Sequence, residues 1–119
     1  MENEEFQVRS PLDQTAYQCR FHTLATGISP RHSDTVDVKF LVNGKGIVLA
    51  LPHAAFASYR QKTGRALTDQ DAIRMAARAL QQLLERGEAV EAGLLTLSPA
   101  QTVELADELA EQLHSAASR

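Results

Sequence analysis

The residues of this chain that could carry out chemistry are a single cysteine, four histidines and one short basic cluster. A nucleophilic cysteine needs a base within reach, and the histidine nearest to Cys19 in the sequence is His22. Side chains alternate between the two faces of a strand, so these two residues would point in opposite directions. Cys19 shares its face with Tyr17 and Phe21, which predicts a small, buried side chain and not a nucleophile.

The histidines do not follow a recognised metal-binding pattern. They are scattered along the chain without a His-Glu-x-x-His motif, at His22, His32, His53 and His114. We therefore predict no catalytic, cofactor-binding or metal-binding residue, and we expect a protein that is not an enzyme. If the protein is an enzyme after all, the alternative hypothesis is a small enzyme that uses Cys19.

A basic cluster, Arg60, Lys62 and Arg65, surrounds the loop that we expect between two central helices. These side chains could hold a phosphate group or the acidic residues of a partner, and a solvated loop explains them as well. Gly44-Lys45-Gly46 is a turn and not a phosphate-binding loop, because an apolar strand follows it where that loop requires Ser or Thr and a helix.

The central predicted element is a β-hairpin over Val36–Leu51, in which apolar residues alternate on both sides of a glycine-rich turn. A type I′ turn at Asn43-Gly44 would pair Val42 with Lys45, and a turn one residue later would pair Val42 with Ile47. Both registers keep one face apolar, so the choice stays open, and glycine at position 43 would suit either turn. The opposite face is half polar and carries Asp37, Lys39, Leu41, Val48 and Ala50.

Two helices are predicted after the hairpin. Pro52 ends the strand and can open a helix over residues 53–63, which Gly64 would end. The next helix, residues 68–86, begins with Thr68 as N-cap and has an acid at the capping-box position. Its apolar residues follow the helical period at Ile73, Ala76, Ala77, Leu80, Leu83 and Leu84, and its polar residues, Arg78 among them, fall opposite.

The remaining segments complete an α+β pattern. Residues 16–25 alternate as a half-buried strand, Gly27–Thr35 is rich in turn formers and predicts a loop, and Ser98-Pro99 begins a final helix. Phe6 and Val8, and the apolar run at 94–97, could add short edge strands.

The predicted architecture is a flexible N-terminal tail (1–12) and a single α+β domain (13–119). Its sheet is three-stranded and antiparallel, formed by the hairpin 36–51 and the strand near 16–25. The sheet packs against two to three C-terminal helices.

Composition and charge favour an intracellular protein. The chain has 119 residues and a net charge of −3. Its single cysteine excludes an internal disulfide, which is consistent with a reducing compartment. The N-terminus, MENEEF, lacks the features of a secretory signal, and no apolar run is long enough to span a bilayer. We expect a cytoplasmic protein of bacterial type. Residues 35–66 hold one acidic and five basic residues and 88–119 hold six acidic and one basic, so these parts could attract each other within or between subunits.

The segment Ile47–Arg86, a strand followed by a short helix that closes at Thr63-Gly64 and then a longer helix, resembles a ribbon–helix–helix DNA-binding domain. In that family the strand pairs with its copy in a dimer and projects polar side chains into the major groove. The outward residues of this strand, Val48 and Ala50, cannot hydrogen-bond to a base edge, so the resemblance concerns the order of elements. Nucleic-acid binding through Arg60, Lys62 and Arg65 is the second functional hypothesis.

The leading hypothesis is a small, non-enzymatic interaction or regulatory module that self-associates as a homodimer and binds another protein. It follows from the lack of a catalytic pattern and from the half-apolar outer face of the predicted sheet. We expect Leu24, Leu41 and Val48 on that face, which would allow dimerisation through the sheet.

Overall fold

The fold is that of a computed structural model, which describes residues 5–9, 14–29, 32–86 and 93–117. Within these ranges the side chains of 26–29, 32–34 and 112–117 are not described. One five-stranded sheet and three helices make up the described part of the chain. The overall α+β class predicted from the sequence is confirmed.

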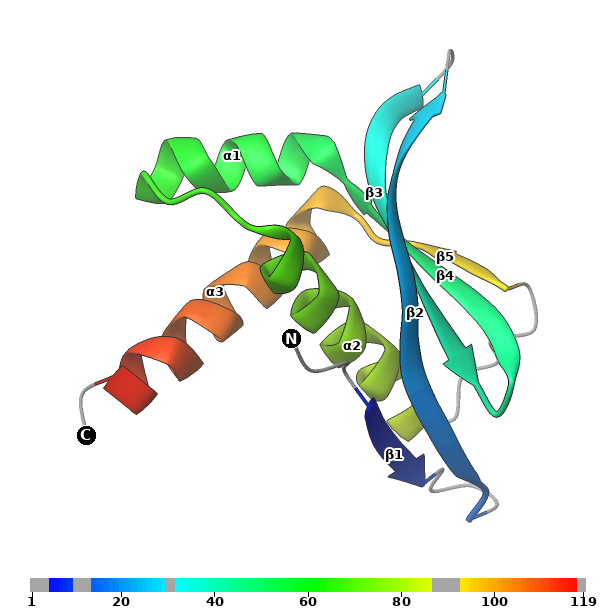
Figure 1. The fold of residues 1–119 in the computed structure, drawn as a ribbon. Helices are drawn as coiled ribbons and strands as arrows, with labels where there is room; N and C mark the ends of the chain where they lie inside the picture. The colour runs from blue at the N-terminus through cyan, green and yellow to red at the C-terminus, as the bar shows by residue number, and fades with distance from the viewer. Residues whose placement is uncertain (1–4, 10–13, 30–31, 87–92, 118–119) are drawn as a thin grey trace.

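The strands follow chain order across the sheet. The first four pair in antiparallel fashion and the fifth runs parallel to the fourth. Figure 1 labels them β1 (Glu5–Arg9), β2 (Ala16–Ser29), β3 (His32–Val42), β4 (Lys45–Pro52) and β5 (Leu94–Thr96). The described helices are α1 (His53–Thr63) and α2 (Asp69–Glu85), which lie between β4 and β5 in the chain, and α3 (Pro99–Ala117), which follows β5.

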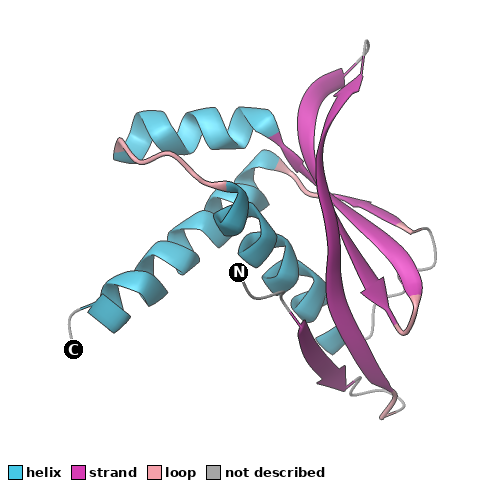
Figure 2. Ribbon diagram, viewed as in Figure 1, coloured by secondary structure: helices cyan, strands magenta, loops and turns pink. Residues whose placement is uncertain are grey.

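All three helices lie on one side of the sheet (Figure 2). The largest fully buried side chains of β3 and β4, which include Phe40, Ile47 and Leu49, join those of the helices, such as Tyr59 and Leu80, in one core. We call the face of the sheet toward this core the inner face and the opposite one the outer face.

The predicted sheet of three antiparallel strands is wrong in size, because β1 and β5 make it a five-stranded mixed sheet. These two strands have only five and three residues. The sequence indicated both only as possible edge strands, because such short runs carry too little alternation to identify a strand with certainty and their place depends on long-range pairing. Val8 of β1 is buried, so the sheet includes a segment that the sequence assigned to the N-terminal tail.

The predicted loop over Gly27–Thr35 is also different in the structure. Its described residues continue β2 and β3, which remain paired as far as Ser29 and His32. Turn-forming residues were therefore a poor guide here, because main-chain pairing of two long strands outweighs the weak strand propensity of single residues.

The hairpin has the first of the two registers left open by the sequence, with Val42 paired to Lys45. Asn43 and Gly44 have positive φ values of 51° and 85°, as a type I′ turn requires. The Asn43 side chain also bridges to β2: its Oδ1 accepts the Gln18 N–H at 2.8 Å, and its Nδ2 donates to the Ala16 carbonyl at 3.3 Å. The turn residue therefore holds three strands together.

Local capping explains where the helices begin and end. Thr68 and Asp71 form the predicted capping box at the start of α2, and Ser98 and Gln101 form one at the start of α3. Gly64 ends α1 with a φ of 76°, in the left-handed region that glycine adopts without strain. The predicted starts of α2 and α3 and the predicted end of α1 are confirmed.

Candidate functional site

The described helices leave the outer face of the sheet uncovered (Figure 1). Pairing registers determine which side chains share it, because neighbours across paired strands point to the same face. Since Val38 and Leu49 are fully buried on the inner face, their chain neighbours Asp37, Lys39, Val48 and Ala50 lie on the outer face. This agrees with the prediction from the hairpin pattern.

Two rows of paired residues cross the middle of this face. The first, the Lys39 row, runs from Lys39 through Val48 to Leu94. The second, the Asp37 row, runs from Asp37 through Ala50 to Thr96. Each row therefore begins with a charge on β3 and continues over apolar or small side chains toward the edge strand β5.

Leu94 is the most exposed large hydrophobic side chain among the described residues, with 55% of its surface accessible. Its strand pairing places it beside Val48, which is partly exposed, and Leu41 lies further along β3 on the same face. The sequence identified Leu41 and Val48 but not Leu94, because the direction of the side chains of β5 depends on its parallel pairing with β4.

The prediction that Leu24 lies on the outer face is wrong. Pairing of β2 with β3 slips between Phe21 and Thr23, so His22 is an extra residue on β2. This bulge shifts the alternation by one position and turns Leu24 inward, where it pairs beside Val38 and packs against the core. A bulge leaves no clear mark in the alternation of a single strand, so the sequence could not show it.

The two charges at the centre of the outer face do not contact each other. Asp37 Oδ1 accepts a hydrogen bond from Thr35 Oγ1 at 2.7 Å. The Lys39 side chain lies across Gly46 instead, with its Cε 2.7 Å from where a Cβ on that glycine would be. Neither charge has an ion-pair partner within the described residues. Both residues are partly buried.

Cys19 does not fit the role of a nucleophile. Its side chain is fully buried on the inner face, as the alternation predicted, and its Sγ lies 3.9 Å from the Tyr17 carbonyl oxygen. Burial raises the pKa of the Cys19 thiol to about 11, which keeps it protonated near neutral pH. His22 is exposed on the bulge and does not meet it.

The other histidines do not form a metal site with acidic residues in the part of the chain that is described, where no cluster of three possible ligands occurs. His53 is exposed at the start of α1 and stacks on Phe56, with ring centroids 5.9 Å apart. The side chains of His32 and His114 lie outside the description.

The structure separates the predicted basic cluster into residues with different surroundings. Lys62 Nζ lies 3.6 Å from Asp107 Oδ2 on α3, and Arg65 Nη2 lies 3.6 Å from Asp71 Oδ2 at the start of α2. Arg60 is exposed in the last turn of α1. Two of these three cations therefore face acids of their own chain, and the Lys62 pair joins the basic middle of the sequence to its acidic C-terminal part.

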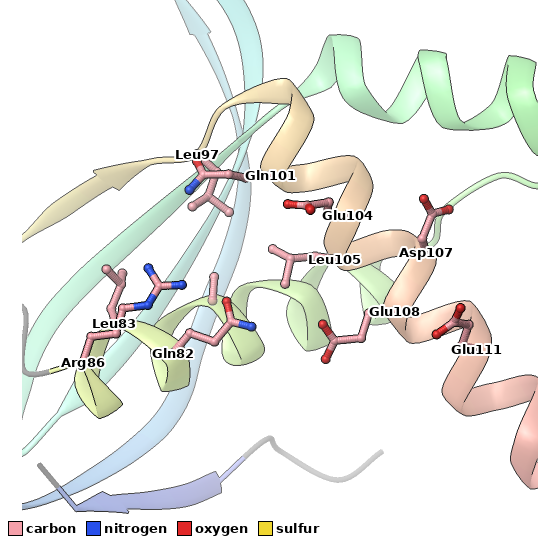
Figure 3. Close-up of a pocket in the computed structure, with 11 residues that line it drawn as sticks. Gln82, Leu83, Arg86, Leu97, Gln101, Glu104, Leu105, Asp107, Glu108 and Glu111 are labelled. Atoms are coloured by element: carbon pink, nitrogen blue, oxygen red, sulfur yellow. The ribbon is translucent and has the colours of Figure 1, made fainter. Parts of the chain in front are cut away.

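A groove of about 480 Å³ separates the second half of α2 from α3 (Figure 3). Leucines line part of it, and acidic side chains of α3, including Glu104, Glu108 and Glu111, line the other side. Arg78 Nε lies 2.9 Å from Glu108 Oε1, so one of these acids is already paired. The residues that line the groove include neither a cysteine nor a histidine, so they do not form a nucleophile–base pair.

No protein-family model, curated protein or solved structure matches this chain. Within the described residues, the structure contains no helix with the length and apolar character needed to cross a bilayer.

Proposed function

We propose that this chain is a non-enzymatic interaction module that self-associates through the outer face of its sheet. One observation carries the proposal: the described helices cover only the inner face, and the outer face presents Leu94 paired beside Val48, with Leu41 further along β3. Burying apolar surface of this kind against a partner removes it from water and stabilises the association.

Cys19 and the basic cluster support the two alternative functions, a cysteine-dependent enzyme and a nucleic-acid-binding protein, less well than the outer face supports self-association. Cys19 is buried and protonated, and two residues of the basic cluster face acids of the same chain. Thiolate character and access are what a nucleophilic cysteine requires, and unpaired cations are what phosphate binding uses. We therefore place self-association before the cysteine-dependent enzyme and the nucleic-acid-binding protein.

The test is Leu94→Glu, which puts a charge at the most exposed apolar position of the face. Ala57→Glu is the matched control, because Ala57 is exposed on α1, away from the sheet surface. We expect light scattering coupled to gel filtration to show a dimer for wild type and Ala57→Glu, and a monomer for Leu94→Glu. Dimers of equal stability for both variants would contradict the proposal.

A further inference from the structure

We propose that the occupant of the outer face is a second copy of this chain, packed face to face about a two-fold axis that crosses β3 above Val38. This inference rests on the proposed function and adds the partner and its geometry. Two sheets that pack face to face keep their strand directions close to aligned, about 10 Å apart. A two-fold axis makes every contact between the two copies reciprocal.

The axis that we infer is parallel to the sheet and perpendicular to β3. Rotation about it reverses each strand and leaves β3 opposite β3 and β4 opposite β4 of the second copy. Val38 lies midway between Asp37 and Lys39, so the rotation exchanges their positions. The Lys39 row of one protomer then faces the Asp37 row of its partner.

Charge complementarity places the axis at this point of β3. Asp37 and Lys39 are two residues apart on one face, which is about 7 Å along a strand. Neither has an ion-pair partner among the described residues, although both are partly buried. The two-fold arrangement gives each charge an opposite charge from the other copy. An axis above Lys39 itself, or above Asp37, would instead bring like charges together.

The same rotation brings large side chains against small ones along the rest of both rows. Val48 of one protomer faces Ala50 of the other, and Leu94 faces Thr96, because the rows are linked by the registers of β3, β4 and β5. On the β2 side, Thr23 and Ala25 belong to these rows in the same way. Side chains of unequal size interdigitate better than equal ones, so one operation satisfies both charge and shape.

Charge reversal tests this geometry in the full chain. Asp37→Lys leaves two cations at the centre of the face, and Lys39→Asp leaves two anions. Each variant alone would face its own copy with like charges, whereas a mixture forms two attractive pairs in a heterodimer. We expect each homodimer to dissociate at least about tenfold more readily than the heterodimer, measured by sedimentation of the separate and mixed samples.

The double variant Asp37→Lys/Lys39→Asp is the control, because it exchanges the charges and should dimerise nearly as wild type does. Circular dichroism melting establishes whether each variant is folded. If a charge-reversal variant does not fold, the single neutral variants Asp37→Asn and Lys39→Gln are used in its place. These neutral variants should both weaken the dimer, since each removes both reciprocal pairs.

The outcomes separate this inference from the proposed function. If Leu94→Glu breaks the dimer but the charge variants dimerise as wild type does and the mixture shows no preference, the face is the interface and the two-fold geometry is wrong. If the wild type is monomeric, both proposals are wrong. Preferential heterodimer formation supports both.

Discussion

Asn43 shows how a single residue can matter beyond its local conformation. The sequence suggested that glycine would serve as well at this position, because either residue tolerates a positive φ. In the structure its side chain forms two hydrogen bonds to β2, to the Gln18 N–H and the Ala16 carbonyl. This role was not predictable from the sequence. Gln18 and Ala16 precede Asn43 by 25 and 27 positions, and only the tertiary fold brings them beside the turn.

We expect Asn43→Gly to destabilise the fold by about 1 kcal/mol, because it removes both side-chain hydrogen bonds at an exposed site. Gly44→Val should cost about 1–3 kcal/mol, since a β-branched residue is strained at the φ of 85° found there. Urea denaturation of both variants checks these values. Wild-type stability for Asn43→Gly would show that the two hydrogen bonds contribute nothing in solution.

Cys19 provides a second test at the scale of one residue. Its pKa rises from 9.0 to about 11 because the thiol is buried, so the folded protein holds this proton more tightly than the unfolded chain does. The stability that this contributes is complete below pH 9 and is lost as the pH rises from about 9 to 11.

Wild type should therefore lose more stability than Cys19→Ala between these pH values in urea denaturation. Cys19 should also react with a thiol reagent only after unfolding, because the native side chain has no exposed surface. Rapid labelling of the native protein, or equal pH dependence for wild type and Cys19→Ala, would contradict this account.

At the scale of elements, the hairpin, the first part of β2 and the helices were predictable because their signals are local. The period of α2, its capping box and the alternation of the hairpin all lie within neighbouring residues. β1 and β5 were indicated only as possible edge strands and the bulge at His22 not at all, because each depends on pairing with a distant strand. For the same reason the sequence placed Val48 correctly on the outer face, placed Leu24 wrongly and missed Leu94.

The period of α2 predicts which of its residues stabilise the packing of helix on sheet. Leu80 is fully buried in the core, so Leu80→Ala should cost about 2–5 kcal/mol in chemical denaturation. Glu85→Ala is the control, because Glu85 is exposed in the same helix and should change stability by less than about 0.5 kcal/mol. Similar losses for the two variants would mean that the helix is rotated relative to the sheet.

The helical period predicted that Arg78 lies on the solvent-facing side of α2, where a substitution would have little effect on stability. It lies 2.9 Å from Glu108 of α3 and donates to the Gln81 side chain, so it links two helices. Both partners of the ion pair are more than a third exposed, which limits its contribution to about 0.2–1 kcal/mol. Arg78 is therefore a less suitable control than Glu85.

At the scale of the whole molecule, the helices bury one face of the sheet and leave the other with a central pair of opposite charges beside an apolar edge. The Lys62–Asp107 ion pair joins the basic middle of the sequence to its acidic C-terminal part. Asp37 and Lys39 have no such partner among the described residues, and a second copy of the chain would provide one for each.

The central claim is that the outer face binds a second copy, and sedimentation equilibrium of the wild-type chain tests it most directly. We predict that the average mass rises from that of one chain toward that of two as the protein concentration increases, and that Leu94→Glu abolishes this rise. A wild-type mass that stays at one chain over the whole concentration range would contradict the claim.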